Sequence, residues 1–192
     1  AQLLPIIDTI RGGYHQVLTK LVLGDNNIGD AGCEAIATLL EDPNCNLRSI
    51  DLRRNQISNA GATILANSLS GNSKLQKLYL QDNSLINRID DIFCGVLCNT
   101  SSINSTYSSN HVLNDVDFFY ASGTQLVSLL KMNEDTNKGH VAMKKILKYH
   151  PNIDMEPLFE WDAEEGERNL KALPYVIDWF DRANTLAVAT NA

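Results

Sequence analysis

Four cysteines are the most reactive side chains of this 192-residue chain, and their spacing decides whether they could hold a metal ion. Cys94 and Cys98 lie four positions apart, so they would share one face of a helix. A tetrahedral zinc site needs four ligands, and no second pair of cysteines or histidines has a matching spacing. We therefore expect no metal site. Free thiols in turn favour an intracellular, cytoplasmic protein. The four predicted buried free thiols are Cys33, Cys45, Cys94 and Cys98.

Sequence motifs for catalysis are missing. The chain has no Gly-rich phosphate loop, no H-E-x-x-H and no G-x-S-x-G. Adjacent carboxylates such as Asp90 and Asp91 are typical of solvated surface charges. We expect no enzymatic activity, no cofactor and no small-molecule substrate.

The remaining candidate chemistry is recognition of another protein. Tyr79 and Tyr107 occupy the same position in successive copies of the repeat described below, with Arg53 and Lys77 at neighbouring positions. Tyr and Arg are the residue types that contribute most to protein interfaces, which makes these four the predicted binding centre. Asp51 and Lys20 belong to the same predicted surface. The alternative is a solvated face whose charges pair with one another.

An internal repeat must position these residues. Copies of the pattern L-x-x-L-x-L-x-x-N-x-L begin at Leu18, Leu47 and Leu75, and a degenerate fourth copy begins at Ile103. The alternating leucines predict a short strand with one buried face, and the Asn position suits a side chain that bonds the backbone of adjacent coils. The residues in that position are Asn26, Asn55, Asn83 and, in the fourth copy, His111.

A helix is expected after each strand, because apolar residues recur at i, i+3, i+4 and i+7 in the linking segments. A single coil of this length cannot close a core, whereas stacked coils can. The predicted strands cover about 20–24, 49–53, 77–81 and 105–109, and the predicted outer helices cover about 30–41, 59–70 and 87–99.

The repeat resembles the ribonuclease-inhibitor-like leucine-rich repeats. Besides the leucine pattern, "IGDAG" at 28–32 and "ISNAG" at 57–61 match the loop-to-helix pattern of that family. The resemblance implies an α/β fold, a right-handed solenoid or horseshoe with parallel inner strands and outer helices. It is specific for the fold and not for a function.

The period is lost after the fourth copy. We therefore divide the chain into a repeat array at 1–114, with a partial first coil, and an all-helical C-terminal cap at 115–192. A solenoid needs such a cap to cover its last coil. The cap sequence resembles those of leucine-rich-repeat proteins of diatoms and related algae, which implies an algal origin.

The predicted concave strand face carries five basic and three acidic residues in a chain whose net charge is −7. Such an acidic chain is unsuited to general nucleic-acid binding, and no apolar run is long enough to span a bilayer. We expect a module that binds an unknown protein partner through the concave face. Two alternatives stay open: a GTPase-activating regulator of a small GTPase, suggested by Arg53 and Arg54, and a surface receptor glycosylated at Asn99 or Asn104.

Overall fold

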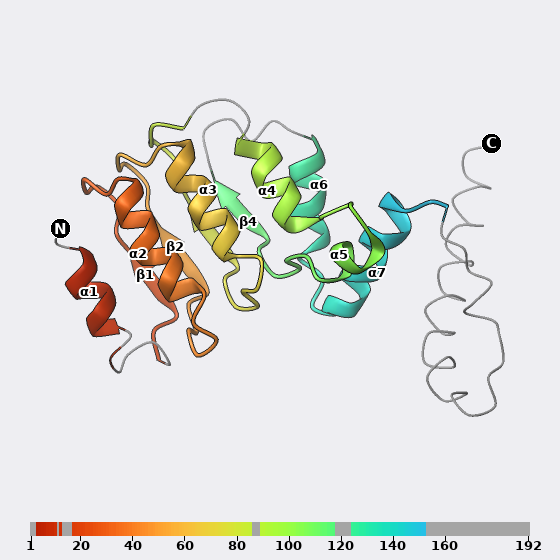
Figure 1. The fold of residues 1–192 in the computed structure, drawn as a ribbon, viewed down its shortest axis with the longest axis horizontal. Coiled ribbons are helices and arrows are strands. Elements are labelled where there is room, and N and C mark those ends of the chain that lie inside the picture. The colour runs from red at the N-terminus through yellow and green to blue at the C-terminus, as the bar shows by residue number, and fades with distance from the viewer. Residues whose placement is uncertain (1–2, 11, 13–16, 86–88, 118–123, 153–192) are drawn as a thin grey trace. The chain divides into compact units, whose positions relative to one another are not determined.

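The structure of the chain is a computed structural model that describes residues 3–10, 12, 17–85, 89–117 and 124–152. Short strands alternate with helices as far as residue 97, and each strand–helix pair there forms one coil of a stack (Figure 1). In chain order, the elements are α1 (Leu3–Thr9), β1 (Lys20–Val22), α2 (Asp30–Leu40), β2 (Ser49–Asp51), α3 (Asn59–Ser68), β3 (Lys77–Tyr79), α4 (Ile89–Leu97), α5 (Ile103–Tyr107), β4 (Asp115–Asp117), α6 (Thr124–Met132) and α7 (Lys138–Tyr149).

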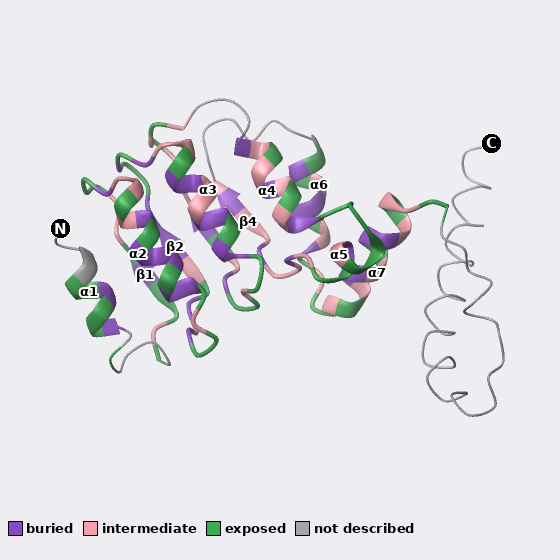
Figure 2. Ribbon diagram, in the orientation of Figure 1, coloured by how far each residue is buried: buried purple, intermediate pink, exposed green. Residues whose placement is uncertain are grey.

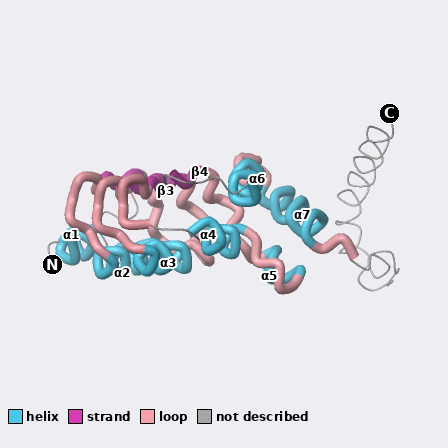
Figure 3. Tube along the Cα trace, turned by 90° about the horizontal axis from the view of Figure 1, so that it is seen from above, coloured by secondary structure: helices cyan, strands magenta, loops and turns pink. Residues whose placement is uncertain are grey.

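The strands form one parallel sheet in the order β1-β2-β3-β4. Parallel neighbours need a crossover connection, which α2 and α3 provide between the first three strands. Figure 3 shows the strands along one side of the stack and α2, α3 and α4 along the other. This two-layer arrangement agrees with the predicted solenoid of inner strands and outer helices.

The core lies between the two layers (Figure 2). Leu21, Ile50 and Leu78 occupy one register across the sheet and are all buried. The helices bury the opposite side of the core, with Ile36 of α2 and Phe93 of α4 fully inaccessible to solvent. Each coil covers the apolar side chains of its neighbour, so the stack and not the single coil is the stable unit.

The fourth coil does not begin where the repeat period predicts. Residues 103–107 form the helix α5, whereas the fourth strand, β4, lies further along the chain and pairs with β3 through Leu78 and Val116. The prediction of a strand at 105–109 is therefore wrong. Its polar sequence suits a capped surface helix, in which the Ser102 hydroxyl accepts a hydrogen bond from the Ser105 amide.

A second motif marks the true start of the fourth coil. Asn72 and Asn110 each stand three positions before a buried leucine, Leu75 or Leu113, and their side chains make equivalent contacts. Each carboxamide oxygen accepts from the backbone amides two and three positions ahead, at 2.8–2.9 Å. Each carboxamide nitrogen donates to the end of the preceding coil's helix segment. N-x-x-L, which also occurs at 44–47, was thus a sequence signal for a coil beginning at Leu113.

Two helices follow β4. α6 packs against α4, and α7 packs against α5. The segment assigned to an all-helical cap therefore starts with a strand of the sheet, and its residues 153–192, including those that resemble algal proteins, lie outside the described residues. None of the helices in the described ranges is long and apolar enough to cross a membrane.

Candidate functional site

Side chains that point away from the buried leucines form what we call the strand face. The strand register aligns Lys20, Ser49, Lys77 and Asp115 in one row across the sheet. It aligns Val22, Asp51, Tyr79 and Asp117 in a second row. Arg53 and Gln81, just beyond the strand ends, continue the face.

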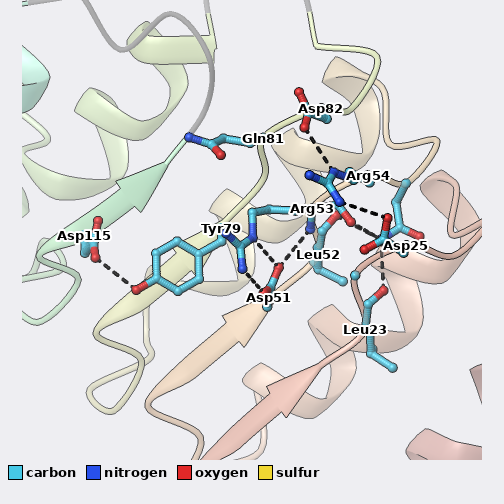
Figure 4. A network of polar contacts seen from close by, with 12 residues as sticks. Leu23, Asp25, Asp51, Leu52, Arg53, Arg54, Tyr79, Gln81, Asp82 and Asp115 are labelled. Carbon is cyan, nitrogen blue, oxygen red and sulfur yellow. Dashed lines mark hydrogen bonds and ion pairs between the residues drawn. The ribbon is translucent and has the colours of Figure 1, made fainter.

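Arg53, Asp51 and Tyr79 form the centre of this face (Figure 4). The Arg53 guanidinium donates from Nε to Asp51 Oδ1 at 2.9 Å and from Nη2 to Asp51 Oδ2 at 2.5 Å. This bidentate pair is the geometry that holds an arginine most firmly. The hydrogen bonds from Arg53 are the main cause of the lowered pKa of Asp51. The guanidinium carbon also lies 5.4 Å from the centroid of the Tyr79 ring, within range of a cation–π contact.

Tyr79 is fixed from its other end by β4. Its hydroxyl donates to Asp115 Oδ2 at 3.2 Å, and Lys77 Nζ lies 3.6 Å from the same oxygen. The pKa of Tyr79 is raised, first by burial and then by the nearby Asp115 carboxylate. Beside it, the Gln81 carboxamide donates to Asp117 Oδ1 at 2.5 Å. The Tyr79 side chain is therefore held by Arg53 at its ring and by Asp115 at its hydroxyl before a partner binds.

Asp115 and Asp117 change the charge of the strand face. With Asp51 they make three acidic residues on this face, which equals its three basic ones, Lys20, Arg53 and Lys77, so the face is neutral rather than carrying the predicted excess of positive charge. Both aspartates belong to the face because the fourth strand lies at 115–117 and not at 105–109.

Lys20 and Val22, on β1, form the exposed end of the strand face. Val22 is 59% exposed although it is apolar, and it stands directly opposite Asp51 in the sheet register. Lys20 is exposed and aligned with Ser49. The face therefore offers an accessible apolar side chain and a cation at one end, and two carboxylates at the other.

A row of turn residues borders the strand face. Asp25, Arg54 and Asp82 directly precede the repeat asparagines and all have positive φ, between 54° and 57°. Asp adopts this backbone region more readily than Arg does. Arg54 lies between the two carboxylates, with nitrogen–oxygen distances of 3.4 Å to each (Figure 4).

Tyr107, which the repeat period predicts beside Tyr79, is not on the strand face. It ends α5, on the helix side of the stack, and is 64% exposed (Figure 3). Asp117 takes its predicted position next to Tyr79. Of the predicted binding residues, the structure brings together Tyr79, Arg53, Asp51 and Lys77, with Lys20 at the edge and Tyr107 elsewhere.

The repeat asparagines connect neighbouring coils. The Asn55 carboxamide donates to the carbonyls of Leu52 and Leu23 and accepts from the Ile28 amide at 2.9 Å. Asn83 makes the equivalent bonds one coil later, including one from the Ile57 amide at 3.0 Å. Asn26 is exposed and donates to carbonyls of its own coil.

His111 does not continue this asparagine row, because the fourth coil starts after it. Its Nε2 lies 3.0 Å from the Tyr107 carbonyl, where only an N–H can bond. Nδ1 is then the acceptor for the Lys145 ammonium at 3.1 Å. Lys145 is fully buried in α7 and also donates to the carbonyls of Leu97 and Asn110. Burial lowers the pKa of His111 to about 4 and that of Lys145 to about 7.

The four cysteines are free thiols; Cys33, Cys45 and Cys98 are buried and Cys94 is partly so. Burial raises the pKa of Cys33 to about 12 and that of Cys94 to about 11. Within the described ranges, no three His, Cys, Asp or Glu side chains gather closely enough to hold a metal ion.

Three segments of the chain match known repeat families. Sequence patterns described as Leucine Rich repeat match residues 14–37 and 44–66, and a further Leucine Rich Repeat pattern matches 74–96. These ranges contain the starts of the first three coils.

Several curated proteins share sequence with this segment. The NACHT, LRR and PYD domains-containing protein 3 of Homo sapiens is 40% identical over 70 residues, which is 36% of this chain and 7% of that protein. The ribonuclease inhibitor of Sus scrofa is 34% identical over 68 residues, 35% of this chain and 15% of the inhibitor. Human NACHT, LRR and PYD domains-containing protein 14 is 28% identical over 148 residues, 73% of this chain and 13% of that protein. The chain thus spans a small part of these relatives.

Among solved structures, the leiomodin-1 actin-binding site 2 chain aligns with a TM-score of 0.49 and 15% identity, over 78% of this chain and 76% of that one.

Proposed function

Because this chain is a ribonuclease-inhibitor-like leucine-rich-repeat protein, we propose that it is a protein-interaction module that binds its partner through the strand face, without catalysis. Proteins with such repeats commonly present their strands to a partner, although the fold alone does not determine a function. The four free cysteines further support an intracellular setting.

The observation that carries the proposal is the ordered pair of Arg53 and Tyr79. Asp51 holds the arginine through two bonds, and Asp115 holds the tyrosine hydroxyl. Side chains that are already fixed lose less conformational entropy on binding, so more of their contact energy appears as affinity. Both residue types are common interface hot spots.

A photo-crosslinking experiment tests the proposal and identifies the partner. A photoreactive amino acid is introduced at Gln81 on the strand face and, as a control, at Thr38 on the exposed side of α2. Extracts of the source cells are irradiated with each protein, and adducts are identified by mass spectrometry. We expect a defined adduct from position 81 and none of the same mass from position 38.

The affinity of the purified partner then measures the role of each residue. Tyr79→Ala and Arg53→Ala should each weaken binding at least about tenfold, or about 1.4 kcal/mol, and Tyr107→Ala should change it less than about twofold. Equal adducts from both crosslinking positions, or full affinity of Tyr79→Ala, would contradict binding through the strand face.

A further inference from the structure

The helix α5 breaks the repeat on the helix side of the stack. The segment from Leu75 to Leu113 is longer than the equivalent segment from Leu47 to Leu75, and the additional residues contain α5. Figure 3 shows α5 beyond the helix layer, away from the strands. Insertions in repeat arrays frequently carry a binding function, because the regular coils around them already provide the fold.

A groove with a volume of about 950 Å³ lies where this insertion meets the regular helices. Its size is at the upper end of the range for ligand sites. α3 provides one side through Asn67, α4 the middle through Ile92, Gly95 and Val96, and α5 the far side through Asn104. The groove is therefore separate from the strand face.

Gly95 lies at the open part of the groove. Glycine is the least favourable residue in a helix interior apart from proline, so its presence usually has a packing reason. Gly61 of α3 has one, since a Cβ there would meet the Asp30 carboxylate and lie 3.0 Å from Cys33 Sγ. A Cβ on Gly95 would meet nothing within 4 Å. A side chain at this position would therefore extend into the open space of the groove, so a substitution here can fill the groove without a clash in the protein.

Contacts with α7 and the residue that follows it hold α5, which forms one wall of the groove, in place. The Thr106 hydroxyl donates to the Asn99 carbonyl at 2.8 Å and, having no second proton, accepts from His150 Nε2 at 2.8 Å. Lys145 reaches the Tyr107 carbonyl at the end of α5 through His111. Two contacts to the α7 segment therefore hold the short helix in place, so the groove exists before a ligand binds.

The lining determines which ligand class fits. Asp91 is the charged side chain among the described residues of the lining, so the groove repels phosphates and nucleic acids and favours a cation. Asn67 and Asn104 each offer donors and an acceptor, which suits a peptide main chain. Ile92 and Val96, one helical turn apart, offer an apolar floor for a side chain.

From the groove, the open glycine and this lining, we propose that the chain has a second binding site on its helix side, for an extended peptide segment. The peptide carries an apolar residue that packs over Gly95 between Ile92 and Val96. A nearby Lys or Arg pairs with Asp91. Asn67 and Asn104 bond the peptide main chain from the two walls.

The proposal can be tested with random heptapeptides displayed on phage and selected on the whole chain. We expect enriched sequences to combine Leu, Ile, Val or Met with Lys or Arg a few positions away. A synthetic peptide of the enriched sequence is then titrated against the parent protein and its variants by fluorescence anisotropy. Absence of a common sequence after selection would overturn the proposal.

Matched variants at one position separate filling of the groove from loss of folding. Gly95→Trp should weaken binding of the peptide at least tenfold, because the indole fills the groove. Gly95→Ala should bind within about threefold of the parent and melt at the same or a higher temperature. Asp91→Asn should weaken binding several-fold and reduce its dependence on salt.

The strand face is the final control. Tyr79→Ala should leave peptide binding unchanged, because it lies on the opposite layer. Full affinity of a folded Gly95→Trp protein would overturn the proposal, and so would a loss of peptide binding in Tyr79→Ala.

Discussion

At the scale of single residues, two positions go against common preferences. Lys145 is buried, and its three N–H groups are used by two backbone carbonyls and His111 rather than by a carboxylate. One of these carbonyls belongs to Leu97, the last residue of α4, where the negative end of the helix dipole favours a cation. Burial still dominates and lowers the pKa of Lys145 to about 7. The second position, Arg54, holds a backbone conformation that Asp and Asn adopt more easily.

Lys145 makes the stability of the protein depend on pH. Between about pH 7 and 9 the unfolded chain keeps a proton on this lysine that the folded chain loses, so the free energy of unfolding rises with pH. We expect an increase of about 1–2 kcal/mol between about pH 6.5 and 8.5, measured by urea denaturation. Above about pH 9, Cys33 and Cys94 act in the opposite direction, because burial raises the pKa of both thiols and keeps them protonated in the folded state.

Two lysine variants isolate this effect. Lys145→Gln should remove the pH dependence, whereas Lys144→Gln, at the exposed neighbouring position, should keep it. A parent protein whose free energy of unfolding is flat over this pH range would show that Lys145 keeps its proton in the folded state.

Arg54 offers a test of backbone strain. Asn tolerates the left-handed region, so Arg54→Asn should leave the urea midpoint unchanged or raise it, despite the loss of the two exposed ion pairs. Arg53→Asn, at the adjacent position without positive φ, removes the partner of Asp51 and should lower the midpoint. A midpoint of Arg54→Asn below that of the parent protein would mean that the ion pairs outweigh the strain.

At the scale of elements, asparagines join the coils at both ends of the strands. Asn55 and Asn83 bond the backbone after each strand, and Asn72 and Asn110 bond it before the next one. Asn133, after α6, continues the second row by donating to the carbonyls of Asn110 and Leu113. Such short strands make few ladder bonds, so these side chains satisfy backbone groups that the sheet does not reach.

The two asparagines at equivalent repeat positions make a matched pair for a stability test. Asn55→Ala should cost about 1–3 kcal/mol, because the buried Ile28 amide loses its acceptor. The Leu23 and Leu52 carbonyls keep their hydrogen bonds from Asn26 and Asn83. Asn26→Ala should cost much less, since its two acceptor carbonyls belong to an exposed turn. Equal losses in urea unfolding would mean that the connection between coils adds little to stability.

At the scale of the whole molecule, the sheet has inner strands and edge strands. β2 and β3 have strand neighbours on both sides, whereas β1 pairs with β2 alone among the described strands. Backbone groups at such an edge are the first to open to solvent.

Hydrogen exchange should therefore be faster in β1 than in the inner strands. We expect the amides of residues 20–22 to exchange at least about tenfold faster than those of 77–79, measured by mass spectrometry after native labelling. The amides of 49–51 should resemble the inner strand β3. Equal protection of β1 and β3 would indicate that another segment or a second chain covers the edge.

The sequence by itself determined the first three coils, because each feature of the repeat has a local cause. Alternating leucines make a one-sided strand, and asparagine bonds the turn that follows it. It therefore predicted that Arg53, Asp51, Lys77 and Tyr79 share one face, which the strand register bears out. It did not predict that Asp115 holds Tyr79, since that contact depends on the position of the fourth strand, whereas Asp51 and Arg53 pair within one coil.

The tertiary structure decided between two positions that the sequence offers for the fourth coil, Ile103 from the repeat period and Leu113 from the N-x-x-L motif. The period favoured Ile103, yet a strand is fixed by its neighbour and by the core that it covers, and β3 pairs with 115–117. The longer connection that contains α5 adds little loop-closure entropy, because this cost grows slowly with loop length. Contacts of Thr106 with His150 and of His111 with Lys145 offset that cost. Both contacts join segments that are distant along the chain, beyond the reach of any local repeat pattern. Tyr107 and His111 were misplaced for this reason, while Asp115 and Asp117 joined the strand face.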